Sequence, residues 1–290
     1  LLINCESESE AKLIDKLARK LRKKVSIGFR LNPNIDAKTH QKISTGKAEN
    51  KFGLSIKNFK SFYKTIKKYK HIKLDALSVH IGSQILSDVP YKKMLNVMSN
   101  LIRELQLDLK FLDLGGGFGI SYNKKDKPID LKKYSESVYK LAKKLKCKII
   151  FEPGRSIIGD TGVLLSKIQY IKKGVKKDFV IIDAGMNDFM RPALYDAVHK
   201  IIPTKKSNSK LKGVIEFVGP ICESTCKFGS YKNYQKMNEN DFVAITNVGA
   251  YGSSLSSNYN SRPLIAELLV NKNKLKYIRK KQDLLKLINS

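Results

Sequence analysis

The sequence predicts an α/β domain followed by an all-β domain. Within residues 1–160, short apolar runs alternate with longer segments of helical period, which is the pattern of parallel βα units. Within residues 161–290 the pattern changes to short β-rich runs separated by turn-forming residues. We therefore place a domain boundary at about residue 160.

The strands of the first domain are predicted to end near Asn4, Arg30, His80, Leu114 and Glu152. The helical stretches between them cover residues 8–23, 57–70, 91–105 and 131–146. This makes about five βα units. Polar motifs follow the strand ends, which is where a (β/α)₈ barrel keeps its active site. Because five units cannot close a barrel of eight, we expect a partial barrel, with about three units, on the order of 100 residues, outside this sequence.

The β-rich runs of the second domain are expected at residues 162–171, 179–183, 213–218, 241–248 and 266–270. The loops between them hold many polar and reactive side chains, including those of Arg191, Tyr195, Cys222, Glu223 and Tyr251. Loops on a rigid scaffold commonly carry function. Taken singly, each of these residues would more often be structural, for example a buried thiol or a core aromatic ring.

Composition indicates a globular cytoplasmic protein. A chain of 290 residues that is 42% hydrophobic can build sizeable cores, and no apolar run reaches the length of a membrane span. The four cysteines are too few and too scattered for a disulfide framework. Cys222 and Cys226 lack a second ligand pair for zinc, and His40, His71 and His199 lie far apart in the sequence, so we expect no metal site.

The net charge of +30 raises the question of nucleic-acid binding. Only eight of the 56 basic residues are arginine, and the lysines are spread over the chain in runs typical of solvated helix faces. No zinc finger, aromatic RNA-binding signature or basic zipper accompanies them. We therefore expect neither a nucleic-acid nor a membrane partner.

Two motifs at strand ends point to a phosphate-bearing cofactor. The run Gly115-Gly116-Gly117-Phe118-Gly119 follows one strand, and Glu152-Pro153-Gly154-Arg155 follows the next. Consecutive glycines let backbone N–H groups approach an anion, and the acid would suit a cationic ring nitrogen. Either motif alone could be an ordinary turn. Ile120 stands where the dinucleotide fingerprint needs its third glycine, which makes a Rossmann domain a poor fit.

These motifs, together with others in the same order along the chain, resemble the diaminopimelate decarboxylases, a family with an alanine-racemase-like barrel and a β domain. The resemblance covers nearly the whole chain. Its further motifs are Phe29-Arg30-Leu31-Asn32-Pro33, Ser44-Thr45-Gly46, Asn50-Lys51-Phe52-Gly53, the segment from Arg191 to Tyr195, and Ser256-Ser257-Asn258-Tyr259-Asn260-Ser261-Arg262-Pro263.

The resemblance implies that the cofactor is pyridoxal 5′-phosphate (PLP). Its phosphate would be held by backbone and hydroxyl groups of Ser83, Gly116, Gly117, Gly154 and Arg155, with Tyr251 reaching it and Pro153 among the cofactor contacts. His80 would stack on the pyridine ring. Glu152 would pair with the pyridinium nitrogen and keep it protonated, so that the ring can take up electrons as CO₂ leaves.

The resemblance also assigns the substrate contacts. Arg155 and Arg191 would bind the substrate's remaining carboxylate, helped by the hydroxyls of Tyr195 and Tyr251. Cys222 would return a proton to Cα, and Glu223 would bind the distal ammonium group of a D-configured centre. In the family this last pair comes from the other subunit, so the resemblance implies a homodimer with shared active sites.

The chain departs from the family in one respect. The family attaches PLP through a lysine in a short Tyr-x-x-Lys-Ala-Asn-like motif at the end of the first barrel strand, and no lysine of this sequence has that context. We expect the motif in a segment before Leu1. The 290 residues alone would then be unable to anchor PLP covalently and are predicted to be inactive.

The leading interpretation is therefore a diaminopimelate decarboxylase, which makes L-lysine and CO₂ from meso-2,6-diaminopimelate. Gln84, the Arg191 segment and Glu223 favour a substrate with a second amino-acid head. The alternatives are a decarboxylase for ornithine, arginine or another basic amino acid on the same fold, and a non-catalytic paralogue that acts as a binding protein.

Overall fold

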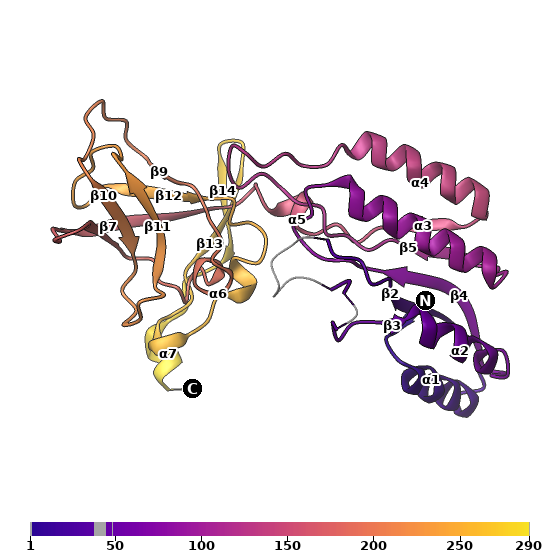
Figure 1. Ribbon diagram of the computed structural model, residues 1–290. Helices are drawn as coiled ribbons and strands as arrows, with labels where there is room; N and C mark the ends of the chain where they lie inside the picture. Colours follow the sequence, from indigo (N-terminus) through magenta and orange to yellow (C-terminus); the bar gives the residue numbers. More distant parts are fainter. Residues whose placement is uncertain (1, 38–44, 48, 290) are drawn as a thin grey trace. The chain divides into compact units, whose positions relative to one another are not determined.

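The computed structural model of the chain describes residues 2–37, 45–47 and 49–289 (Figure 1). His40 and Ser44 lie outside these residues. The chain divides into two compact units. Unit 1 comprises Leu1–Ser121 and Lys125–Ile157, and unit 2 comprises Tyr122–Lys124 and Ile158–Ser290.

Unit 1 is built on a parallel sheet with the strand order β1-β2-β4-β5-β6, and a short β3 pairs with β2. The strands are β1 (Leu2–Cys5), β2 (Val25–Asn32), β3 (Leu54–Ser55), β4 (Ile72–Val79), β5 (Phe111–Asp113) and β6 (Lys148–Ile150). The five strands expected from the sequence are confirmed as β1, β2, β4, β5 and β6, and each ends within two residues of its predicted end. All carboxyl ends therefore lie at one edge of the sheet.

Helices connect these strands (Figure 1). They are α1 (Glu8–Lys20), α2 (Ile56–Ile66), α3 (Asp88–Glu104), α4 (Leu131–Leu145) and the short α5 (Arg155–Ile158). Ser7 caps α1 by accepting from Glu10 N, and the Glu10 carboxylate accepts from Glu6 N at 2.6 Å and from Ser7 Oγ at 3.1 Å. α1 ends at Lys20, earlier than the predicted residue 23, because Arg22 adopts a left-handed conformation with φ 51°.

The core of unit 1 lies where the helices pack on the sheet. Phe29 of β2 is fully buried and contacts the rings of Phe59 and Phe62 on α2 at centroid distances of 5.8 Å each. Leu77 on β4 and Met98 on α3 are also fully buried. β4 is buried along almost its whole length, as expected for a strand in a covered parallel sheet.

Unit 2 contains a six-stranded sheet with the order β11-β10-β8-β7-β12-β9. Its strands are β7 (Val163–Lys172), β8 (Asp178–Ile182), β9 (Ile201–Pro203), β10 (Val214–Val218), β11 (Lys227–Lys232) and β12 (Phe242–Thr246). The pairs are antiparallel except β8 with β10. The predicted β-rich runs are confirmed, whereas β9 and β11 had no counterpart in the prediction, because β9 is only three residues long and β11 is interrupted by polar residues.

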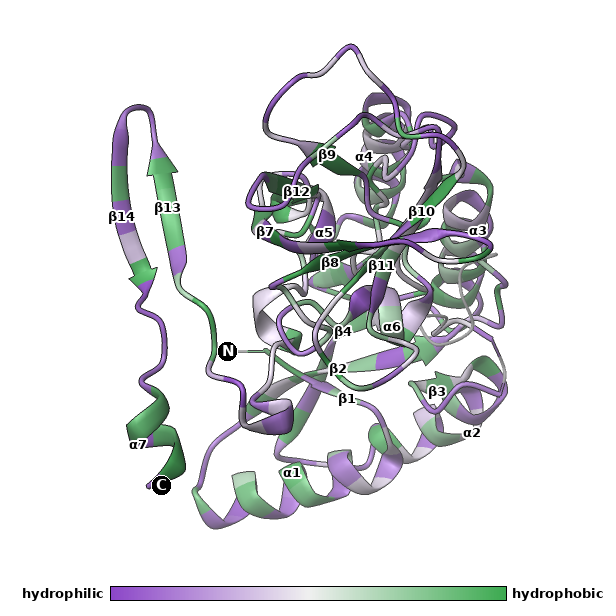
Figure 2. Cartoon of the chain, turned by 90° about the vertical axis from the view of Figure 1, so that its left-hand side faces the viewer, coloured by the Kyte–Doolittle hydropathy of each residue, from purple (hydrophilic) through white to green (hydrophobic). Residues whose placement is uncertain are grey.

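Short helices and a hairpin complete unit 2. The helices are α6 (Arg191–Tyr195), α7 (Leu284–Ile288) and the 3₁₀ turns η2 (Ser253–Leu255) and η3 (Tyr259–Ser261). The hairpin joins β13 (Glu267–Asn271) to β14 (Lys274–Arg279), and in the described chain these two strands pair only with each other. β13 is coloured largely as hydrophobic in Figure 2, and its Leu269 and Val270 side chains are exposed.

Candidate active site

The candidate site in unit 1 lies at the carboxyl ends of β4, β5 and β6, where three loops meet. Glu152 N donates to Gly115 O at 2.8 Å, and Ile85 N donates to Gly117 O at 2.9 Å. A Cβ on Gly116 would lie 2.1 Å from Glu152 O, and one on Gly117, whose φ is +91°, would lie 2.1 Å from Gly82 O. Only glycine permits this approach, so the cluster joins the loops after β4 and β6.

His80 follows β4 and is fixed through its ring and its backbone. Gly116 N donates to His80 Nδ1 at 3.2 Å, and Thr45 Oγ1 donates to His80 O at 2.7 Å. Burial, assisted by the nearby Arg30 charge, lowers the pKa of His80 to about 4. The ring is therefore neutral at pH 7 and carries its proton on Nε2, since Nδ1 accepts.

Glu152 shares its surroundings with a second acid, Asp113, which ends β5. Asp113 is 2% exposed, and its carboxylate accepts from Gly115 N at 2.9 Å and from Asn4 Nδ2 at 3.4 Å. Burial raises the pKa of Asp113. Burial and the adjacent Asp113 carboxylate raise the pKa of Glu152, while the Arg30 charge opposes this rise. Glu152 itself remains exposed.

Asp113 and Arg30 received no role from the sequence, although Arg30 lies inside a quoted motif and Asp113 ends the strand before the glycine cluster. Arg30 at the end of β2 pairs with Glu6 at 2.7 Å and stacks over the Phe52 ring at 4.7 Å. The sequence signal that could have identified Asp113 and Arg30 is the polar residue at the end of each strand. The strand ends of a parallel sheet lie at one edge, so such residues come close together. Together these residues set the electrostatics around Glu152.

Arg155 and Ser83 connect the loops after β6 and β4. Arg155, at the start of α5, is 5% exposed and donates through Nη2 to Ser83 Oγ at 3.1 Å. Pro153 and Gly154 form the preceding turn. A buried guanidinium beside a hydroxyl and the glycine loops forms a group of donors suited to an anion.

Gln84 has a structural role in this arrangement. Its side-chain amide donates to Ile120 O at 2.7 Å and its amide oxygen accepts from Ile120 N at 3.2 Å. Gln84 also adopts a left-handed backbone with φ 62°. The side chain thus holds the loop that follows the glycine cluster, and the geometry does not support the expectation that it selects the substrate.

The predicted residues of unit 2 form two groups. In the first, Arg191 begins α6 and is 6% exposed, and its Nη1 donates to Tyr122 Oη at 2.8 Å and to His199 Nε2 at 3.1 Å. Tyr195 ends the same helix and is half-buried. Neither Tyr122 nor His199 was assigned to the site from the sequence.

The second group surrounds Glu223. Tyr259 Oη donates to one Glu223 carboxylate oxygen, and Thr225 Oγ1 donates to the other at 3.2 Å. The hydrogen bond to Glu223 and the negative charge of the Glu223 carboxylate raise the pKa of Tyr259. The neighbouring Cys222 is an exposed free thiol. Tyr259 lay within a quoted motif but received no role from the sequence.

Two further segments of unit 2 are held in defined conformations. Arg262 donates through Nε to Asn187 Oδ1 at 3.1 Å and through Nη2 to Asp183 O at 2.8 Å, which ties the segment before α6 to the segment around residue 260. Tyr251 is 44% exposed and adopts a left-handed backbone with φ 64°. A tyrosine in this conformation is uncommon and is often found at functional sites.

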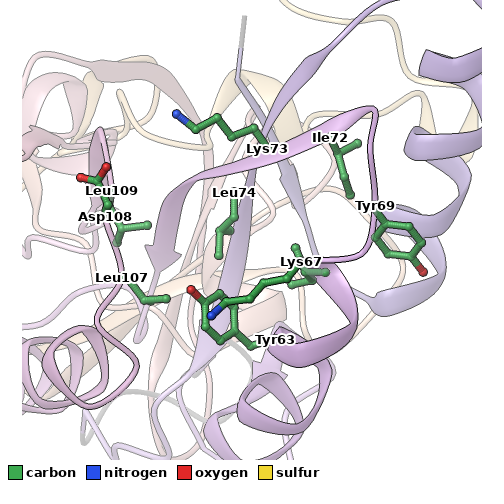
Figure 3. Close-up of a pocket in the computed structure, with 10 residues that line it drawn as sticks. Tyr63, Lys67, Tyr69, Ile72, Lys73, Leu74, Leu107, Asp108 and Leu109 are labelled. Atoms are coloured by element: carbon green, nitrogen blue, oxygen red, sulfur yellow. The ribbon is translucent and has the colours of Figure 1, made fainter.

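One cavity lies away from these groups. It has a volume of about 200 Å³ and is lined by residues including Tyr63, Lys67, Lys73 and Leu107 (Figure 3). Ile72, Lys73 and Leu74 belong to the start of β4, the opposite end of that strand from His80. The cavity is therefore separate from the loops that form the unit 1 site.

The described residues contain no group of three or more histidine, cysteine, aspartate or glutamate side chains arranged to hold a metal ion. Over the same residues, no helix has the length and apolar character needed to cross a membrane.

Comparison with known proteins identifies the family. Residues 2–159 match the pyridoxal-binding domain of the pyridoxal-dependent decarboxylases. The diaminopimelate decarboxylase of Aquifex aeolicus is 39% identical over 286 residues, which cover 98% of this chain and 68% of that protein. A Helicobacter pylori diaminopimelate decarboxylase is 42% identical over 288 residues, which cover 98% of this chain and 71% of that protein.

The solved structures agree. The crystal structure of the Helicobacter pylori diaminopimelate decarboxylase complexed with L-lysine matches with a TM-score of 0.91 and 40% identity, over 100% of this chain and 72% of that one. The diaminopimelate decarboxylase of m. jannaschi matches with a TM-score of 0.88 and 35% identity, over 100% of this chain and 68% of that one. The chain therefore belongs to the diaminopimelate decarboxylase family of pyridoxal-dependent decarboxylases.

Proposed function

We infer that the protein is a PLP-dependent carboxy-lyase that converts meso-2,6-diaminopimelate into L-lysine and CO₂, the last step of lysine biosynthesis. The observation that carries this inference is the junction of Gly116 with the Glu152 loop, where a Cβ would lie only 2.1 Å from Glu152 O. It places the loop that carries the ionisable acid Glu152 beside the glycine cluster. This combination suits a cofactor with an anionic phosphate and a cationic ring nitrogen.

The residues present fit PLP. We propose that Gly116, Gly117, Ser83 and the Gly154–Arg155 backbone hold the phosphate. The close approach of these loops at Gly116 and Gly117 and the hydrogen bond of 3.1 Å from Arg155 to Ser83 support this assignment. When bound, PLP supplies an electron sink for the electron pair left on Cα as CO₂ departs.

Glu152 and His80 would act on the ring of the cofactor. A carboxylate at Glu152 favours the protonated ring nitrogen because opposite charges attract in a partly desolvated site. The neutral His80 ring, fixed by Gly116 N at 3.2 Å, would stack on the pyridine without adding a competing positive charge. These two residues orient and polarise the cofactor.

We propose that unit 2 contributes to binding the second amino-acid head of the substrate. Arg191 of unit 2 and Arg155 of unit 1 would hold the carboxylate that stays on the product, because a guanidinium offers two parallel donors. Tyr195 and Tyr251 would add hydroxyl contacts. A substrate that carries both carboxylate and ammonium groups explains why a buried arginine and an exposed acid both occur in the loops of unit 2.

Cys222 would serve the reacting centre and Glu223 the distal end of the substrate. Cys222 would return a proton to Cα after CO₂ has left, and the Glu223 carboxylate would bind the distal ammonium group of the substrate. Hydrogen bonds from Tyr259 and Thr225 fix the Glu223 carboxylate in one orientation. The negative charge of Glu223 is thereby held in a fixed position before the substrate binds.

We further propose a cytoplasmic homodimer in which residues 1–160 bind the cofactor and residues 161–290 supply substrate and dimer-interface loops. The exposure of Cys222 and Glu223 supports the sharing of sites, and the four free cysteines suit a reducing compartment. Neither nucleic acid nor membrane is proposed as a partner, because the lysines lie on dispersed exposed faces, such as Lys143 and Lys144 on α4.

Mixing two inactive variants tests the shared site. We expect Glu152→Gln and Cys222→Ser each to lose most decarboxylase activity in the complete gene product. If the sites are shared, subunit exchange between them should restore about a quarter of the wild-type activity, because half of the dimers are mixed and each mixed dimer has one intact site. No recovery after demonstrated exchange would show that each chain uses its own Cys222.

Substrate preference tests the reaction. We expect the PLP-loaded gene product to favour meso-diaminopimelate over L-ornithine in kcat/KM, and Arg191→Gln to reduce kcat/KM for diaminopimelate by about 100-fold, as loss of a charged contact predicts. Ornithine lacks the second carboxylate, so its low turnover should be insensitive to this change. A wild-type preference for ornithine would favour the alternative decarboxylase.

A further inference from the structure

We propose that His199 is a positioning residue for the substrate-binding guanidinium of Arg191. It acts as a neutral histidine, protonated only on Nδ1, and Tyr122 assists it. This inference rests on the proposed role of Arg191 in binding the substrate's remaining carboxylate. All three residues belong to unit 2.

The hydrogen bonds define the tautomer of His199. Arg191 Nη1 lies 3.1 Å from His199 Nε2, and a guanidinium nitrogen can only donate, so Nε2 must accept. His199 Nδ1 lies 3.0 Å from Thr246 O, which can only accept, so Nδ1 must carry the proton. Both contacts hold together only in the neutral Nδ1–H form. A proton on Nε2 would place two donors and two positive charges against each other.

Packing fixes the His199 ring. The residue is 1% exposed, and its ring meets the Phe189 ring edge-on at 4.7 Å and the Tyr122 ring edge-on at 5.0 Å. Tyr122 also contacts Arg191 directly, with the guanidinium carbon 5.0 Å from the ring centroid and Nη1 2.8 Å from the hydroxyl oxygen. His199 and Tyr122 therefore both accept hydrogen bonds from Nη1 of Arg191 and together fix the orientation of the guanidinium.

The backbone of His199 is anchored by the sheet. His199 lies two residues before β9, in which Ile201 pairs with Ile245 of β12, and Thr246 N donates to Lys200 O at 2.9 Å. Tyr231 Oη donates to His199 O at 3.2 Å. The position of the ring thus follows from strand register, which should survive replacement of the side chain.

The neutral state of the two acceptors has a consequence for binding. A carboxylate at either position would form an ion pair with Arg191 and compete with the carboxylate of the substrate. His199 Nε2 and Tyr122 Oη orient the guanidinium and leave its charge uncancelled by these two contacts. We therefore expect His199 to govern affinity for carboxylate-bearing ligands and to leave the chemical step unchanged.

The test uses His199→Phe, which keeps a ring and loses both nitrogens, in the complete PLP-loaded gene product. KM for meso-diaminopimelate should rise about 10- to 100-fold, the loss expected for a hydrogen bond to a charged group, while kcat changes less than about threefold. His199→Gln, whose amide oxygen can accept from Arg191, should recover most of the loss. His71→Gln in unit 1 serves as the matched control and should leave KM unchanged.

Two inhibitors separate positioning from general disruption. L-lysine and 1,5-diaminopentane carry the same two amines and differ by one carboxylate. His199→Phe should weaken inhibition by L-lysine and leave inhibition by 1,5-diaminopentane unchanged. Equal weakening of both would overturn the proposal. Tyr122→Phe, which removes one hydroxyl, should raise KM in the same selective way and provides the test if His199→Phe does not fold.

Arg191→Gln distinguishes failure of this inference from failure of the proposed function. If Arg191→Gln raises KM and His199→Phe and Tyr122→Phe do not, positioning by His199 is wrong and the role of Arg191 stands. If Arg191→Gln also leaves KM unchanged, Arg191 does not bind the carboxylate, and the positioning proposal fails together with that assignment.

Discussion

At the scale of single residues, the acid pair Asp113 and Glu152 determines how the site responds to pH. The pKa of Glu152 is raised, so its carboxyl group takes up a proton at a higher pH than an ordinary glutamate does. A protonated Glu152 cannot pair with a cationic ring nitrogen. PLP affinity should therefore fall as pH is lowered through this raised pKa.

Titration of PLP by absorbance at several pH values checks this expectation. Glu152→Gln should weaken PLP binding about 10-fold or more at pH 7, as loss of a charged hydrogen bond predicts, and should remove most of the pH dependence. Asp113→Asn should shift the fall in affinity to lower pH, because it removes the charge that raises the pKa of Glu152. An unchanged pH profile in Glu152→Gln would exclude Glu152 as the partner of the ring.

His80 makes a second prediction, for stability. Its folded pKa of about 4 lies below the ordinary value of 6.5, so between these values the unfolded state binds the proton and the folded state does not. The contribution of His80 to the free energy of unfolding is fully present above pH 6.5. It is lost as pH falls toward 4, by at most about 1.4 kcal/mol per pH unit.

Urea denaturation at pH 7 and pH 5 measures this contribution. The drop in the free energy of unfolding between the two conditions should be smaller in His80→Gln than in the wild type. An equal drop in both proteins would mean that His80 is as readily protonated in the folded state as in the unfolded one.

At the scale of elements, the junction of the loops after β5 and β6 depends on the absence of a side chain at Gly116. A methyl group there would lie 2.1 Å from Glu152 O, so Gly116→Ala should force the loops apart, with a cost of about 1–3 kcal/mol. We expect PLP affinity to fall at least about 10-fold, since the phosphate and ring contacts lie on these loops.

Gly213→Ala provides the control for Gly116→Ala. Gly213 has a φ of +83°, and no atom lies within 4 Å of its added Cβ. The Gly213→Ala substitution should lower the free energy of unfolding by about 1 kcal/mol through backbone strain and leave PLP binding unchanged. If Gly116→Ala binds PLP as tightly as the wild type, the close approach of these loops is not required for the cofactor.

At the scale of the whole molecule, the strands and helices of unit 1 could be predicted because their signals are local. The alternation of apolar runs and helical segments located the ends of β1, β2, β4, β5 and β6 within two residues, whereas the two-residue β3 was not predicted. The glycine and Glu152 motifs come directly after two of these strand ends. The position of a motif after a strand is also a local property, and convergence of the strand ends follows from parallel pairing.

The remaining features depend on pairing that the local sequence does not show. His199 meets Arg191 and Thr246 because β9 pairs with β12, and the short β9 carries almost no periodic signal. Tyr122 belongs to unit 2 although the sequence on either side of residues 122–124 belongs to unit 1. Likewise, Asp113 raises the pKa of Glu152 only because β5 lies beside β6.

The most direct measurement is the product balance of the complete gene product with PLP and meso-diaminopimelate. The proposed reaction yields equal amounts of CO₂ and L-lysine, and its turnover should depend on added PLP after the cofactor has been removed. Tight PLP binding without release of CO₂ from diaminopimelate would contradict it, as would release of CO₂ from ornithine or arginine in preference.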